Sequence, residues 1–175
     1  MNVYILRHAS AGTRRANPVI DVRRPLDKEG KQQCILIASY LNALRVQFDL
    51  VVSSPLKRAL QTASMVATET GYESKIMVSE ALAPGASVTA FLTLVDDLSV
   101  YENVLLVGHN PNLPQFLGAL IASPGRAAVR LRKGAIARVD STRRPGTLHW
   151  LVDPRILRGL YTRVTKSSLR KTSRK

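Results

Sequence analysis

The sequence predicts an α/β fold: a three-layer sandwich in which a central, mostly parallel sheet is flanked by helices. Short β-branched and apolar segments alternate with longer segments whose apolar residues recur at helical spacing. This alternation is typical of parallel strands joined by helices. One predicted strand, Asn103–Val107, is uniformly apolar, as expected when helices cover both faces of the sheet. The chain has 175 residues, which is enough for one domain with a sizeable core.

The first half of the chain holds three predicted strands separated by two predicted helices. In order, these are a strand at 2–7, a helix at 28–44, a strand at 48–52, a helix at 56–69 and a strand at 75–78. Asp27 is the expected N-cap of the first helix, and Gly30 is an unfavourable residue inside it. Ser54 is the expected N-cap of the second helix, with Pro55 at its first position. Residues 8–24 are expected to form a polar loop.

The second half contains two more helices, a strand and a hairpin. In order, these are a helix at 87–98, a strand at 103–107, a helix at 111–121, and strands at 134–139 and 147–152. Ser87 is the expected N-cap of the first of these helices. The last two strands are expected to pair through a turn at Arg143–Gly146.

The positive charge is concentrated in the C-terminal part of the chain. In total, 26 Lys and Arg face 12 Asp and Glu, which gives a net charge of +14. Residues 1–123 hold 11 basic and 10 acidic side chains, whereas residues 124–175 hold 15 and 2. We therefore expect a domain at 1–154 and a basic tail at 155–175. The tail is interpreted as a solubilising end or, alternatively, as an arm that docks on an acidic partner, a membrane surface or nucleic acid.

Composition excludes several classes of protein. The hydrophobic fraction of 45% and the charged fraction of 22% argue against a wholly disordered chain. No apolar run approaches the roughly 18 residues of a transmembrane helix, and Arg7 and His8 interrupt the apolar start too early for a signal peptide. A single cysteine, Cys34, excludes an internal disulfide and a cysteine-rich zinc site. The expected compartment is the cytoplasm.

Polar residues stand where three predicted strands end. They are Arg7-His8, Ser53-Ser54-Pro55 with Arg58 one turn later, and Gly108-His109-Asn110. Sites in open α/β sheets form at the carboxyl ends of the strands, so we expect these side chains to converge. The helices that follow would add backbone N–H donors.

Two arginines and two histidines in one pocket suit phosphoryl transfer through a phosphohistidine. Guanidinium groups bind a tetrahedral oxyanion in a bidentate manner. A neutral, oriented imidazole can be a covalent nucleophile, and a second histidine can stabilise the equatorial oxygens if it is protonated. Two histidines without a carboxylate pair make a poor metal site, so no metal or organic cofactor is expected. Taken singly, each residue has an ordinary structural explanation, and only the joint pattern predicts a site.

The same segments resemble the histidine phosphatase superfamily, which also contains the phosphoglycerate mutases. The similar motifs are Leu6-Arg7-His8-Ala9, Ser53–Ala63 and Val107-Gly108-His109-Asn110-Pro111. In order and spacing the resemblance covers about residues 1–152. Two further segments, Arg24-Pro25-Leu26 and Glu80–Pro84, are most similar to the small bacterial phosphohistidine phosphatases of the SixA type.

The resemblance implies a phosphoglycerate mutase-like sandwich and a role for each matched residue. His8 would be the phosphorylated nucleophile, and Arg7, Arg58 and His109 would bind the phosphoryl oxygens. Ala9 departs from the glycine that is usual in the superfamily. The proton donor stays open between two residues: Glu80, which follows the third strand, and Asp21, which lies in the first loop.

Chain length refines the expected substrate. Only 50 residues separate Arg58 from His109, which leaves no room for a large lid insertion. An open site favours a phosphate displayed on another protein, such as phosphohistidine on a signalling (phosphotransfer) protein. His8 would take the phosphoryl group and water would then remove it. The alternatives are a broad phosphatase for small phosphate esters, and a phosphate- or nucleic-acid-binding module without catalysis.

Overall fold

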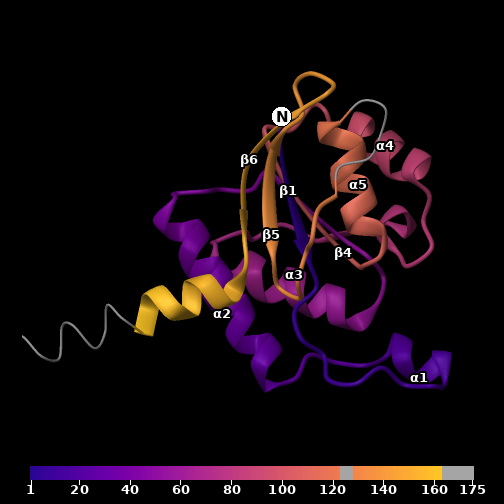
Figure 1. Ribbon diagram of the computed structural model, residues 1–175, viewed down its shortest axis with the longest axis vertical. Coiled ribbons are helices and arrows are strands. Elements are labelled where there is room, and N and C mark those ends of the chain that lie inside the picture. The colour runs from indigo at the N-terminus through magenta and orange to yellow at the C-terminus, as the bar shows by residue number, and fades with distance from the viewer. Residues whose placement is uncertain (123–127, 163–175) are drawn as a thin grey trace, which may run out of the picture.

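A computed structural model describes residues 1–122 and 128–162, and in this part of the chain six strands form one sheet (Figure 1). The strands are β1 (Asn2–Arg7), β2 (Leu50–Ser53), β3 (Met77–Val78), β4 (Asn103–Gly108), β5 (Ile136–Asp140) and β6 (Thr147–Val152). Their spatial order is β3-β2-β4-β1-β5-β6. The first four are mutually parallel, and β5 and β6 are antiparallel to their neighbours. The predicted mostly parallel sheet and C-terminal hairpin are thus confirmed.

Helices cover both faces of this sheet, as predicted. Alternate residues of β1 face opposite sides: Val3 and Ile5 pack toward α4 (Val88–Asp97) and α5 (Asn112–Ile121). Tyr4 and Leu6 pack toward α2 (Lys28–Ala43) and α3 (Lys57–Glu69). Every side chain of the strand interior is therefore buried, which explains why the central strands are uniformly apolar.

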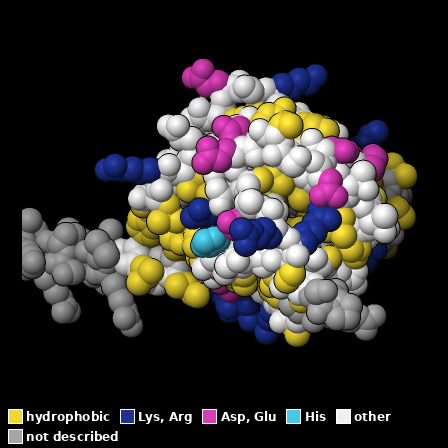
Figure 2. Space-filling model, turned by 90° about the horizontal axis from the view of Figure 1, so that it is seen from above, with side chains coloured by type: hydrophobic (Ala, Val, Ile, Leu, Met, Phe, Trp, Pro, Cys, Tyr) yellow, Lys and Arg dark blue, Asp and Glu magenta, His cyan; other side chains and the backbone are white. Residues whose placement is uncertain are grey.

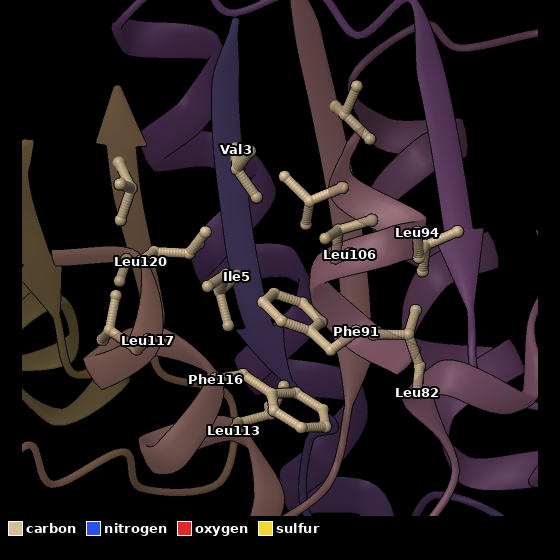
Figure 3. Close-up of a cluster of buried hydrophobic side chains, with 14 of the residues drawn as sticks. Val3, Ile5, Leu82, Phe91, Leu94, Leu106, Leu113, Phe116, Leu117 and Leu120 are labelled. Carbon is tan, nitrogen blue, oxygen red and sulfur yellow. The ribbon is translucent and has the colours of Figure 1, made fainter. Parts of the chain in front are cut away.

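The core beneath α4 and α5 is built from aliphatic side chains around two stacked phenylalanines. The ring centroids of Phe91 and Phe116 lie 4.3 Å apart, and the ring planes differ by 5°. Figure 3 shows these rings between the helices and β1 and β4, with the aliphatic side chains of the same cluster around them. Leu82, from the short 3-10 helix η1 (Glu80–Leu82), closes this cluster next to the strand ends.

The core beneath α2 and α3 is more aromatic. The Tyr4 ring makes edge-to-face contacts with Phe48 at 5.2 Å and with Trp150 at 5.9 Å. Residues 154–162 are helical, and Leu157 from this helix is 4% exposed in the same cluster. The start of the predicted basic tail therefore packs on the sheet, whereas its residues 163–175 lie outside the described residues.

Two predicted helix starts are confirmed and one is wrong. The Asp27 and Ser87 side chains cap α2 and α4. However, α3 begins at Lys57 after Leu56, and no side chain caps it. Ser54 precedes this start: its hydroxyl accepts from the Leu56 N–H at 3.4 Å and also lies 2.8 Å from His109 Nε2. The predicted loop at 8–24 also contains a helix that was not predicted, α1 (Pro18–Val22).

Gly30 is required by packing and is not merely tolerated in α2. A Cβ atom at this position would lie 1.9 Å from the carbonyl oxygen of Ser10. Only glycine allows the chain that follows β1 to approach the helix this closely. Gly30 therefore allows the loop that follows Arg7-His8 to pack directly against α2.

No helix among residues 1–122 and 128–162 is long and apolar enough to cross a membrane.

Candidate active site

The strand register brings the two histidines together. Arg7 at the end of β1 pairs with Gly108 at the end of the parallel strand β4. Each strand then continues into a histidine, and the backbone N–H of His8 donates to the Gly108 carbonyl at 3.0 Å. The centroids of the His8 and His109 rings lie 4.9 Å apart. The predicted convergence of these strand ends is thus present in the structure.

A pocket of about 800 Å³ opens at this edge of the sheet. Its charged lining consists of six basic side chains and one acidic side chain: Arg7, Arg14, Arg15, Arg24, Arg58, Lys133 and Asp21. Both histidines also line it. The opposite end of the molecule is different, because there acidic and basic side chains are interspersed over the surface (Figure 2). The basic lining therefore favours an anion in the pocket.

Hydrogen bonding fixes the tautomer of His8. Its Nδ1 lies 2.8 Å from the carbonyl oxygen of Ala9, and a carbonyl can only accept, so Nδ1 carries the proton. The lone pair is then on Nε2. Burial and the nearby guanidinium of Arg58 lower the pKa of His8 to about 3. At neutral pH His8 is consequently a neutral imidazole with an available Nε2 lone pair.

His109 is buried and contacts Ser54. Its Nε2 lies 2.8 Å from the Ser54 hydroxyl, whereas its buried Nδ1 has no hydrogen-bond partner. Burial and the neighbouring His8 lower the pKa of His109 to about 2. The ring is therefore neutral in this structure, and the protonated form considered from the sequence is disfavoured here.

Arg7 and Arg58 each present a buried Nε atom without a partner. Arg7 is anchored by its Nη1, which donates to the Leu131 carbonyl at 2.9 Å. Arg58 is anchored by its Nη1, which donates to the backbone carbonyl of Asp21 at 3.1 Å. Burial lowers the pKa of both guanidiniums, which nevertheless stay charged because arginine titrates far above neutrality. An oxyanion in the pocket would satisfy these donors.

Asp21 lies in the pocket as the partner of cations. Its carboxylate accepts from the Arg15 backbone at 2.9 Å and from Arg24 Nε at 2.8 Å, and it lies 3.4 Å from Arg58 Nη1. The Arg15 hydrogen bond and the Arg24 guanidinium hold the pKa of Asp21 below its usual range. Asp21 is thus ionised and stabilises the arginines around it.

Glu80 is not brought to the same place. It is exposed at the start of η1 and is absent from the pocket lining. Of the two predicted proton donors, only Asp21 therefore faces the pocket.

Arg24 is a pocket residue that was not identified as such from the sequence. Its Nη1 donates to the carbonyl oxygens of Ala11 and Gly12, at 2.7 and 3.2 Å. Arg24 therefore also stabilises the loop after His8. A signal was present in the sequence: four arginines and one acid lie between residues 8 and 24. Such an excess of cations in a short segment after a strand indicates anion binding.

Three polar side chains hold the loop that orients His8. Thr62 Oγ1 accepts from the Ala9 N–H at 3.1 Å and donates to the Arg58 carbonyl at 2.7 Å. Gln33 accepts from the Ser10 N–H at 2.9 Å, and Asp27 accepts from the Ser10 hydroxyl at 2.8 Å. Thr62 thereby links the helix that carries Arg58 to Ala9, whose carbonyl accepts the hydrogen bond from His8. Neither Thr62 nor Gln33 was predicted from the sequence as a residue of the site.

The assembled groups suit transfer of a phosphoryl group to a nitrogen nucleophile. One imidazole has a free lone pair, and two guanidiniums have unpaired donors beside it. In the described part of the chain, no group of three or more His, Cys, Asp or Glu side chains is arranged to hold a metal ion.

Comparisons with known proteins agree with this chemistry. Residues 3–83 match the model of the histidine phosphatase superfamily (branch 1). Phosphohistidine phosphatase SixA of Escherichia coli (strain K12) is 31% identical, over 88% of this chain and 94% of that protein. An uncharacterized protein of Picosynechococcus sp. is 32% identical, over 78% of this chain and 82% of that protein. The structure of the protein histidine phosphatase SixA complexed with tungstate is similar, with a TM-score of 0.80 and 29% identity over 90% of this chain and 99% of that chain.

Proposed function

Since this chain belongs to the histidine phosphatase superfamily, we propose that it is a phosphohistidine phosphatase whose substrate is a phosphohistidine displayed on a signalling protein. The observation that carries the proposal is the state of His8. Its Nδ1 proton is donated to Ala9, which leaves the Nε2 lone pair for attack on phosphorus. A protonated His8 would be inert, and its pKa of about 3 keeps it neutral at physiological pH.

The reaction has two in-line steps. In the first, Nε2 of His8 forms a bond to phosphorus while the bond from phosphorus to the substrate's imidazole nitrogen breaks. The departing imidazole keeps the electron pair of that bond. In the second step, water attacks the phosphoryl group on His8, the Nε2–phosphorus bond breaks, and inorganic phosphate leaves.

Arg7, Arg58 and His109 would stabilise the phosphoryl oxygens as negative charge spreads over them. The unpartnered Nε atoms of both arginines support this role. His109 would act as a neutral donor through Nδ1 if Ser54 donates its hydroxyl proton to Nε2. That arrangement is favoured because the Ser54 oxygen already accepts from the Leu56 N–H at 3.4 Å. The related SixA structure contains tungstate, a tetrahedral oxyanion.

The leaving group explains why a strong proton donor is not required. A phosphoramidate bond is labile, and an imidazole protonated on its distal nitrogen leaves as a neutral molecule. Asp21 is a poor acid because the Arg15 hydrogen bond and Arg24 hold its pKa low, and Glu80 is exposed outside the pocket. We assign neither as general acid for phosphohistidine. An alkyl phosphate needs protonation of its leaving oxygen, so this pocket favours the phosphoramidate.

A substrate panel tests the proposal. Purified enzyme is given a histidine-phosphorylated phosphotransfer protein, a phosphoserine peptide and a sugar phosphate, with His8→Asn as the blank. We expect turnover of the phosphohistidine protein and a phosphoryl group trapped on Nε2 of His8 after an alkaline quench. Turnover of the esters alone would favour a small-molecule phosphatase, and oxyanion binding without turnover of any substrate would favour a binding module.

A further inference from the structure

We infer that α1, together with the exposed arginines beside it, is a docking surface for an acidic protein whose apolar patch adjoins its phosphorylated side chain. This inference rests on the proposed function, because the phosphate must enter the pocket that α1 borders. Pro18, Asp21 and Val22 of this helix line the pocket. A protein that delivers a phosphohistidine to His8 therefore comes close to α1.

Asp21 faces the pocket, and the apolar side chains of α1 are exposed to solvent. The Asp21 side chain is 14% exposed, since it faces Arg24 and Arg58 at the pocket. The two residues before it lie elsewhere on the helix surface, and Val19 and Ile20 are 65% and 55% exposed. No residue of α1 is buried. The pairing of Asp21 thus fixes the helix in an orientation that leaves its apolar side chains in water.

The exposed apolar side chains of α1 are close together in the sequence. Val19, Ile20 and Val22 are three exposed large hydrophobic residues within four positions, a density that no other exposed segment of the described chain reaches. Isolated exposed apolar residues are ordinary, but a cluster next to a polar pocket is typical of an interaction site. Burying these side chains would favour association through the hydrophobic effect.

The positive charges around α1 indicate that the protein that docks there is acidic. Arg14, Arg15 and Arg23 are exposed around α1, and the acid within this segment, Asp21, is already paired with Arg24 and Arg58. The outward surface is therefore apolar in its centre and cationic at its edge. An acidic protein is attracted to such an edge. A basic protein lacks the complementary charge, and a nucleic acid lacks an apolar patch.

A paired kinetic experiment tests the docking surface. The double variant V19S/I20S removes apolar area without touching a pocket-lining residue. The probes are an acidic phosphotransfer protein phosphorylated on histidine and free phosphohistidine. We expect kcat/KM for the protein to fall about tenfold, mainly through KM, while kcat/KM for free phosphohistidine is unchanged. The matched control is V100S, because Val100 is 84% exposed and lies shortly before β4, at the opposite end of the sheet.

A second variant separates apolar contact from charge. V19K/I20K replaces the branched apolar side chains with flexible charged ones, so it weakens the protein reaction if apolar burial dominates and strengthens it if charge alone acts. Unchanged kinetics of V19S/I20S on the phosphoprotein, an equal loss on both substrates, or a stronger reaction of V19K/I20K would overturn the inference. If the parent enzyme fails to turn over any phosphohistidine protein, the proposed function fails, and this inference fails with it.

Discussion

The Ser54 hydroxyl lies 2.8 Å from Nε2 of His109, although 55 positions separate the two residues in the chain. Ser54 follows β2 and His109 follows β4, and these strands are neighbours in the sheet. The contact therefore connects two neighbouring strand ends next to the pocket that His109 lines. It engages Nε2 of His109, whereas the buried Nδ1 has no hydrogen-bond partner.

Ser54→Ala removes this contact, and we expect kcat to fall about tenfold because one orienting hydrogen bond is lost. The matched control is Ser53→Ala: Ser53 is equally buried, but its hydroxyl donates to the Ser54 carbonyl and does not touch His109. In the double variant Ser54→Ala/His109→Ala, the serine substitution should add little to the loss from His109→Ala. Additive losses would show that Ser54 does not act through His109.

The two arginines are expected to be indispensable for turnover. Arg7→Ala and Arg58→Ala should each lower kcat by about 10²–10³, because each removes a guanidinium that lines the pocket and carries an unpaired donor. Tungstate binding, followed by calorimetry, should weaken in parallel. Arg130→Ala is the control, since Arg130 is exposed and does not line the pocket. A folded Arg7 or Arg58 variant with near-parent activity would remove that residue from the mechanism.

Asp21→Asn distinguishes a counterion from a proton donor. The carboxylate competes with an anionic substrate for Arg24 and Arg58, so its neutralisation should tighten tungstate binding. Turnover of a phosphohistidine protein should persist within about tenfold, since the leaving imidazole needs no strong acid. Glu80→Gln is the companion variant and should resemble the parent. A loss of kcat by about 10² or more in Asp21→Asn would instead support catalysis by this acid.

The two buried histidines should make the folded state sensitive to acid. The pKa is about 3 for His8 and about 2 for His109 in the folded protein, against an ordinary value near 6.5. Below pH 6.5 the unfolded chain binds protons that the folded chain does not, so stability falls as the pH is lowered from about 6.5 toward 3. Each histidine contributes up to about 1.4 kcal/mol per pH unit in this window. Urea denaturation of His8→Asn across this range should show a shallower slope than the parent protein.

Gly30→Ala is expected to destabilise the fold and the site together. The added methyl group would overlap the Ser10 carbonyl, which lies 1.9 Å from the ideal Cβ position. Overpacking of this kind typically costs about 1–3 kcal/mol, and moving Ser10 would also displace the loop that orients His8. Gly159→Ala is the matched control in the helical segment 154–162, because a Cβ there meets nothing within 4 Å. That change should be neutral or stabilising. Equal melting temperatures for the two variants would contradict the account of Gly30.

The sequence by itself determined the layers of this protein and the residues at its strand ends. Apolar runs specify buried parallel strands, and helical spacing specifies the covering helices, since both patterns follow from local geometry. Arg7, His8, Arg58 and His109 could be found because their position after strands or early in a helix is itself a local feature of the chain.

Only the tertiary structure decided how these groups act on one another. The strand order places β4 between β1 and β2, which sets His109 between His8 and Ser54. The N-cap predicted for Ser54 was wrong because α3 begins two residues later than expected, at Lys57. The Ser54 hydroxyl also has a long-range contact with His109, which local rules do not describe. Asp21 and Glu80 were equivalent candidates in the sequence, yet folding pairs Asp21 with two guanidiniums and leaves Glu80 exposed. Contacts across the sheet depend on which strands pair, and pairing is a property of the whole chain and not of any one segment.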